Sequence, residues 1–191
     1  MKGLICGVGI NDADYIVSKK SNGVTVRCRY YSRWKDMIRR CYSERRGSEH
    51  AAYEGCSVCD EWKSFMSFRG WMQRQDWMNK HLDKDILIPG NKVYAPDLCV
   101  FVDDITNTFL TTGRPNGNGL LTGAVWDKSR GKFMATCGNP FSKKANNLGR
   151  FDTEIEAHNA WKKRKHQIAC MLADVQRDER VAEALRSRYA D

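Results

Sequence analysis

The segment that most constrains this chain is residues 111–119, which contains no large apolar side chain. Three glycines, one proline and two asparagines stand in this segment. Such a stretch cannot supply a core and is typical of a linker or a long loop. A chain of 191 residues divided in this way is long enough for two small modules. We therefore predict one module in residues 1–112 and a second in residues 113–191.

The composition is that of a soluble, globular protein. Hydrophobic residues make up 41% of the chain, and its six Trp, seven Tyr and seven Phe are too many aromatics for a disordered protein. Apolar runs are too short to cross a bilayer, and the N-terminus lacks the apolar stretch of a signal peptide. We expect no membrane partner, a cytoplasmic location, and eight cysteines that stay reduced.

Positive charge gathers in the C-terminal half. The chain carries a net charge of +9, and between residues 113 and 170 eleven Lys and Arg stand against four Asp and Glu. A concentrated basic surface favours a polyanionic partner, most often nucleic acid. The alternatives from charge alone are a solvated Lys-rich face, or RNA in place of DNA.

The pattern after residue 119 predicts a three-stranded antiparallel sheet backed by one helix. Strands are expected at residues 121–129, 133–137 and 147–151, with a tight turn at residues 130–132. Thr153 and Glu156 have the spacing of a capping box, which predicts that a long helix begins there. A helical tail is expected over residues 176–191. Because side chains alternate along a strand, Phe133, Ala135 and Cys137 should face the helix.

The order of motifs in this half resembles a known family of DNA-binding domains. The motifs are Gly123-Ala124-Val125-Trp126-Asp127-Lys128, Gly131-Lys132-Phe133-Met134-Ala135 and Leu148-Gly149-Arg150-Phe151-Asp152-Thr153. Residues 119–170 resemble the APETALA/ethylene-response-factor domain, which implies a sheet that lies in the major groove of double-stranded DNA. With strand alternation, this places the following residues on the DNA-contacting face: Trp126, Lys128, Arg130, Lys132, Thr136 and Arg150. The alternative is that Trp126 belongs to the core and the lysines are merely solvated.

The first half combines aromatic helices with a strand–loop–strand–helix pattern. Apolar residues at helical spacing predict helices over residues 31–41 and from Asp60 onward, whose aromatics should form the core. Leu82-Asp83-Lys84-Asp85, Leu98-Cys99-Val100-Phe101-Val102 and Asn107 then follow. Together these segments resemble the HNH ββα-metal fold. A wider pattern adds Trp34-x-x-Met37-x-x-Arg40-Cys41-Tyr42, Val58-Cys59-x-x-Trp62-x-x-Phe65 and Gly90-Asn91-Lys92-x-Tyr94. With these motifs the whole chain resembles bacteriophage proteins of the HNH endonuclease type. The expected fold class is α+β. The resemblance to bacteriophage proteins implies the cytoplasm of a bacterial host as the location.

The HNH resemblance implies catalytic positions, and this chain fills them only in part. Asp83 and Asn107 match the ligands of a Mg²⁺ or Mn²⁺ ion, and His81 or a metal-bound water would supply the base. Lys84 stands where the family has its general-base His, and Leu98 stands where an Asn orients that His. A lysine with an ordinary pKa is protonated at neutral pH and is a poor base.

A second metal is considered because Cys56 and Cys59 have the spacing of a zinc knuckle. Cys41 and Cys99 are the thiols that could complete a structural Zn²⁺ site. The alternative is that all four are packed, reduced cysteines.

The expected function is DNA binding together with metal-dependent phosphodiester hydrolysis, as in homing-type HNH endonucleases. The alternative is an inactive, nuclease-derived protein that binds DNA or a host protein without cutting. The missing His and Asn favour this alternative.

Overall fold

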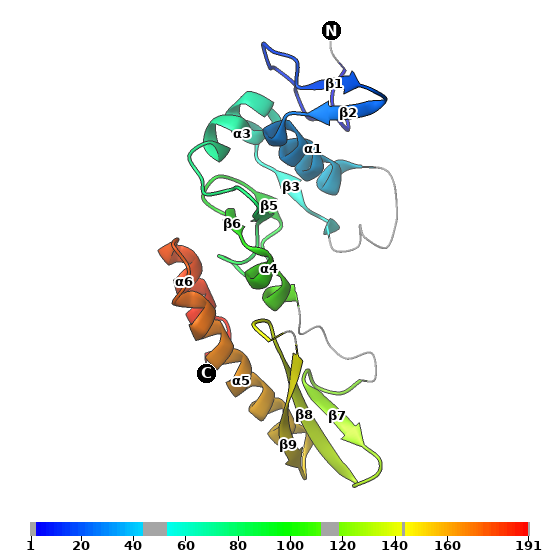
Figure 1. Cartoon of the computed structure of the whole chain (residues 1–191), viewed down its shortest axis with the longest axis vertical. Helices are drawn as coiled ribbons and strands as arrows, with labels where there is room; N and C mark the ends of the chain where they lie inside the picture. The colour runs from blue at the N-terminus through cyan, green and yellow to red at the C-terminus, as the bar shows by residue number, and fades with distance from the viewer. Residues whose placement is uncertain (1–2, 44–52, 112–118, 143, 191) are drawn as a thin grey trace. The chain divides into compact units, whose positions relative to one another are not determined.

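The computed structural model describes residues 3–43, 53–111, 119–142 and 144–190. The chain forms two compact units, Met1–Val102 and Asp103–Asp191, and its fold class is mixed α+β (Figure 1). The boundary lies ahead of the expected one after residue 112, because the helix at Asp104–Thr111 packs in the second unit.

The described residues of the first unit contain three helices and three two-stranded sheets. The helices are α1 (Arg29–Tyr42), α2 (Asp60–Lys63) and α3 (Phe65–Met72). Strands β1 (Ser18–Ser21) and β2 (Val24–Arg27) pair antiparallel, β3 (Ser57–Val58) and β5 (Val93–Tyr94) pair parallel, and β4 (His81–Asp83) and β6 (Val100–Val102) pair antiparallel.

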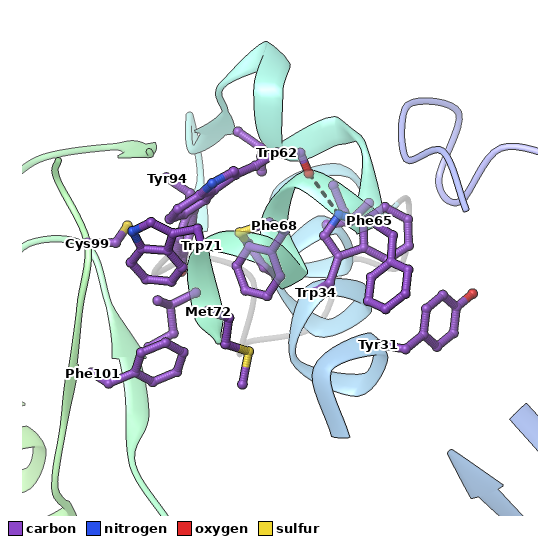
Figure 2. Close-up of a cluster of buried hydrophobic side chains, with 14 of the residues drawn as sticks. Tyr31, Trp34, Trp62, Phe65, Phe68, Trp71, Met72, Tyr94, Cys99 and Phe101 are labelled. Atoms are coloured by element: carbon purple, nitrogen blue, oxygen red, sulfur yellow. Dashed lines mark hydrogen bonds between the residues drawn. The ribbon is translucent and has the colours of Figure 1, made fainter. Parts of the chain in front are cut away.

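Aromatic side chains from α1, α2 and α3 form the core of this unit, as the helical spacing predicts (Figure 2). Trp34, Trp62 and Phe65 are fully buried. The indole Nε1 of Trp34 donates a hydrogen bond of 2.7 Å to the backbone oxygen of Trp62, so this polar group is satisfied inside the core. Phe101 of β6 stacks on Trp71 of α3, which joins the β4–β6 pair to the same core.

The helix expected from Asp60 is interrupted at Ser64. Asp60 does not cap α2; its carboxylate instead pairs with Lys63 at 2.6 Å. Ser64 lies between the two helices in an extended conformation, and its Oγ accepts a hydrogen bond from the backbone N–H of Ser67. The interruption lets Phe65 N donate to the backbone oxygen of Ile10, which holds the N-terminal segment against α3.

The second unit contains the expected three-stranded antiparallel sheet. Its strands are β7 (Ala124–Asp127), β8 (Lys132–Asn139) and β9 (Lys144–Phe151), in the order β7–β8–β9. Helix α5 (Glu154–Ala173) begins with the predicted capping box of Thr153 and Glu156, and α6 (Glu179–Ser187) follows it. Ala124 and Ala135 pack against Ala157 of α5, with Phe133, Leu148 and Phe151 around them, so the helix covers the predicted face.

Glycine is favoured at two positions of this unit for different structural reasons. Gly123, just before β7, has φ +84°, and an added Cβ would stand 2.1 Å from Cγ of Trp161, so the backbone lies too close to α5 for a side chain there. Gly149 lies beside the bulge between β8 and β9 and has φ +117°, a conformation that favours glycine. A Cβ at Gly149 would meet only the ring of Phe151, at 3.8 Å.

Helix α4 (Asp104–Thr111) is attached to α5 through a buried lysine, and to the segments on either side of α6 through Gln176 and Tyr189. Lys165 of α5 is 2% exposed, and its Nζ donates a 2.9 Å hydrogen bond to the backbone oxygen of Phe109. The same ammonium lies 3.8 Å from the centre of the Phe109 ring. Gln176 donates to Thr106 at 3.2 Å, and Tyr189 meets Phe109 edge-on. These contacts place α4 in the second unit.

We expect the free energy of unfolding of the wild type to rise with pH above pH 8, and we expect Lys165→Met to remove this rise. Burial lowers the pKa of Lys165 to about 8, from an ordinary value of 10.5. Below pH 8 the folded and unfolded states both hold the proton, so the residue adds no pH dependence. Above pH 8 the unfolded state binds more protons, so the wild-type free energy of unfolding should increase, by up to about 1.4 kcal/mol per pH unit. Urea unfolding of both proteins between pH 7 and 10 checks this, and parallel profiles would contradict it.

In the part of the chain that the structure describes, no helix has both the length and the apolar character needed to cross a membrane.

Candidate nuclease-like strand pair and nucleic-acid interface

Asp83, the expected metal ligand, ends β4 and shapes the turn that follows it. Its Oδ1 accepts hydrogen bonds from the backbone N–H groups of Asp85, at 2.9 Å, and Ile86, at 2.7 Å. Burial and the nearby charge of Asp85 raise the pKa of Asp83, although the two backbone donors oppose this shift. One carboxylate oxygen of Asp83 is therefore already used by the turn.

Lys84, which the HNH resemblance places at the general-base position, is a buried crosslink. The residue is 6% exposed, and its Nζ donates to Oδ2 of Asp85 at 3.0 Å and to the backbone oxygen of Asn91 at 2.9 Å. Burial acts to lower the pKa of Lys84, but the hydrogen bond and charge of Asp85 outweigh it, so the pKa lies above its ordinary value. Lys84 is thus protonated at neutral pH and cannot accept a proton from water.

Asn91 completes this crosslink. Its sequence context does not mark it as a site residue. Its Nδ2 donates to the backbone oxygens of Lys84, at 2.6 Å, and Val93, at 2.8 Å. Its Oδ1 accepts from the N–H of Val93 at 3.0 Å. The turn signal Pro89-Gly90-Asn91 marks the bend, but only the folded loop brings Asn91 back to Lys84.

The remaining expected catalytic residues lie on two different elements. His81 and Asp83 share one side of β4 and are half-buried, with the buried Leu82 between them on the other side. Asn107 is half-buried on α4, where its N–H donates to the backbone oxygen of Asp103. Asp83 belongs to the first unit and Asn107 to the second, so the expected metal pair is not part of one compact unit.

The four cysteines of the expected zinc site are free thiols in the first unit. Cys56 and Cys99 are buried, whereas Cys41 and Cys59 are half-buried. Burial raises the pKa of Cys41 and of Cys99 to about 12, so both are neutral at physiological pH. Within the described ranges, no three His, Cys, Asp or Glu side chains form a group that could hold a metal ion.

In the second unit, the face of the sheet turned away from α5 presents polar and charged side chains. Val125 pairs with Met134, which pairs in turn with Arg150 of β9, so these three side chains share the face opposite Ala124 and Ala135. Polar strand residues that share this face are Asp127, Lys132, Thr136 and Asn147. All seven are half-buried or exposed. We call these seven residues the open face.

The expected outward orientation of Trp126 is wrong. Trp126 lies directly opposite Phe133, and the two ring centres are 4.8 Å apart. Residues opposite one another on antiparallel strands point to the same side, so Trp126 lies on the face of the sheet that packs against α5. Trp126 is nevertheless 44% exposed. Strand alternation cannot relate Trp126 to Lys128 and Arg130, because both of those residues lie in the turn after β7.

Ion pairs hold two cations of the sheet in place. Nε of Arg150 lies 2.8 Å from Asp127, and Nζ of Lys132 lies 2.9 Å from Asp152. Hydrogen bonds from Ser129 and from Arg150 lower the pKa of Asp127 to about 2. The Lys132–Asp152 pair is exposed, and exposed pairs contribute little free energy, about 0–1 kcal/mol, so a phosphate can replace Asp152 there. Lys128 and Arg130 are exposed at the turn beside these pairs.

Comparison of the chain with protein-family models, with curated proteins and with solved structures finds no match. The candidate sites therefore rest on the geometry of this chain and on the sequence resemblances alone.

Proposed function

We propose that the protein binds double-stranded DNA through the open face of the β7–β8–β9 sheet. The observation that carries this proposal is the asymmetry of the sheet. One face is closed by α5, while the other presents Lys132, Arg150 and Thr136 beside the exposed turn with Lys128 and Arg130.

The two parts of this surface suit different parts of a duplex. The cations of the turn are long, exposed side chains that can reach phosphate oxygens and position the protein. Arg150, Thr136 and Asn147 lie nearer the middle of the sheet, where they can donate to or accept from base edges in the major groove. Asp127 orients the guanidinium of Arg150 before DNA is bound, which lowers the entropy lost on binding.

We further propose that the first unit does not cut DNA, which is the alternative that the sequence left open. One carboxylate oxygen of Asp83 is used by the turn after β4, and Lys84 is a protonated crosslink. A supercoiled plasmid incubated with the protein and Mg²⁺ or Mn²⁺ should stay intact. Nicking that is lost with chelator and in Asp83→Ala would show that the chain is a metal-dependent nuclease instead. A host protein remains the other candidate partner if the protein does not bind DNA.

Replacing Lys128, Arg130 and Lys132 together by alanine should weaken DNA binding by roughly 10- to 100-fold at 100 mM salt. Each lost phosphate contact should also lower the slope of log affinity against log salt by about 0.9. Fluorescence anisotropy with a labelled duplex over several salt concentrations measures both quantities.

The matched control is the triple variant of Lys162, Lys163 and Arg164 to alanine. It removes the same charge from α5, on the other side of the sheet. We expect it to change affinity by less than about threefold, through long-range electrostatics alone. If the α5 variant binds more weakly than the sheet variant, the assignment of the open face is wrong.

A further inference from the structure

The β1–β2 hairpin is a two-stranded ribbon whose side chains are all exposed. The burial pattern is exposed at each of its eight strand positions. Its turn residues Asn22 and Gly23 have φ +50° and +77°, the left-handed pair of a type I′ turn, which gives a short and strongly twisted ribbon. Figure 1 shows the ribbon outside the group formed by α1 and α3.

The base of the ribbon is anchored although its strands are exposed. Cys28 N donates to the backbone oxygen of Val17 at 2.9 Å, which closes the ribbon at its base. The guanidinium of Arg69, on α3, lies 5.2 Å from the ring centre of Tyr15 and 5.8 Å from that of Tyr30. These two tyrosines stand just before and just after the ribbon, so α3 holds both ends of the segment.

The ribbon is positively charged on both faces. Residues 18–29 contain Lys19, Lys20, Arg27 and Arg29 and no Asp or Glu. The register places Lys19 opposite Val26 on one face, and Lys20 opposite Thr25 on the other. Val24 and Val26 are 65% and 50% exposed, so the apolar part of the ribbon also faces solvent.

We propose that the β1–β2 ribbon is a second DNA-contact element, which enters the major groove of double-stranded DNA. The charge without any acidic residue selects a polyanion. Two strands about 4.8 Å apart fit a groove about 12 Å wide, whereas the major groove of duplex RNA is too narrow for a ribbon with side chains. Lysines on both faces can reach the phosphates on either side, and the valines can contact thymine methyl groups.

A different reason for lysines on this ribbon is protection against self-association. Exposed edge strands often carry lysine, because its charge prevents pairing with another chain. This explanation accounts for Lys19 and Lys20 without any ligand. The two explanations differ in outcome, because protection predicts that removing the charges raises self-association and leaves DNA affinity unchanged.

The inference rests on the proposed function only in taking double-stranded DNA as the polyanion. The ribbon and the open face lie in different units, so each can be tested separately. The test compares full-length wild type with Lys19→Gln/Lys20→Gln/Arg27→Gln, called the ribbon variant. The matched control is Arg39→Gln/Arg74→Gln/Lys92→Gln, which removes the same charge from exposed positions of the same unit. The Lys128, Arg130 and Lys132 alanine variant reports separately on the sheet.

Affinity for a random-sequence duplex is measured by anisotropy, and guanine N7 in the major groove is probed with dimethyl sulfate. The ribbon variant should bind at least about tenfold more weakly at 100 mM salt, with a salt slope smaller by about two to three, because each phosphate contact contributes about 0.9. Some guanine protection seen with wild type should be lost. The control should stay within about threefold of wild type.

Several outcomes would overturn the inference. They are an affinity of the ribbon variant equal to that of the control, an unchanged guanine pattern, or increased self-association in gel filtration as the only effect. Equal affinity of wild type for duplex RNA and DNA would also overturn it. If the ribbon variant binds weakly while the sheet variant binds normally, the ribbon inference stands and the proposed role of the sheet fails. If wild type binds no duplex, both fail.

Discussion

Replacing Gly123 with alanine is expected to destabilise the second unit by about 2–6 kcal/mol. Two effects add. A non-glycine residue at φ +84° is strained by about 1–3 kcal/mol. The new Cβ would also stand 2.1 Å from Cγ of Trp161, so α5 must move away from the sheet, and overpacking of this kind usually costs about 1–3 kcal/mol. Urea unfolding followed by circular dichroism measures the change.

Gly131→Ala is the matched control for this variant. Gly131 also has a positive φ, of +60°, but a Cβ there would meet no atom within 4 Å. It should therefore show the backbone strain alone, about 1 kcal/mol. Equal losses in the two variants would mean that the contact between Gly123 and Trp161 does not limit how closely α5 packs.

Replacing Lys84 with alanine is expected to destabilise the first unit by about 2–4 kcal/mol. The variant leaves the Asn91 carbonyl without its donor and removes the cation next to Asp83 and Asp85. Loss of one partner from a buried polar network is among the larger effects of single substitutions. Lys84→His should be destabilising for the same reason, because a shorter imidazole cannot keep both contacts. Thermal and urea unfolding measure the loss.

Two controls separate the ammonium from the rest of the side chain. Lys84→Met keeps an apolar chain of similar length, so its difference from Lys84→Ala reports the packing of the stem. Lys92→Ala removes an exposed lysine of the same loop and should change stability by no more than about 0.5 kcal/mol. A Lys84→His protein that is fully stable and nicks plasmid with Mg²⁺ would contradict both the crosslink and the proposal that the first unit does not cut.

Local signals predicted the regular elements of this chain well. The capping box of Thr153 and Glu156 uses only neighbouring residues, so it forms as the sequence predicts. The helical spacing from Tyr31 to Cys41 and the strand alternation of Phe133 and Ala135 likewise require no knowledge of distant segments. The interruption at Ser64 was missed because it serves a contact with Ile10, more than 50 residues away.

The candidate sites could be predicted only in part, for the same reason. Trp126 was assigned to the wrong face because the turn after β7 begins earlier than the pattern predicts, and only the pairing with Phe133 reveals its side. The close approach between Gly123 and α5 could not be predicted either, because it depends on the contact with Trp161 of the helix. Each of these features depends on how distant segments are aligned. In a strand, a shift of one residue moves every side chain to the other face of the sheet.

The sequence by itself determined an α+β chain with aromatic helices, a three-stranded sheet backed by a helix, and an excess of positive charge, because periodicity, capping and composition are local properties. Only the tertiary structure decided that Lys84 is bonded to Asn91, that α4 packs with the second unit through Lys165, and that the β1–β2 ribbon is exposed on both faces. Whether a polar side chain is buried and bonded depends on segments far away in the chain. The same residues can therefore be read as a catalytic site in the sequence and yet form a crosslink in the fold.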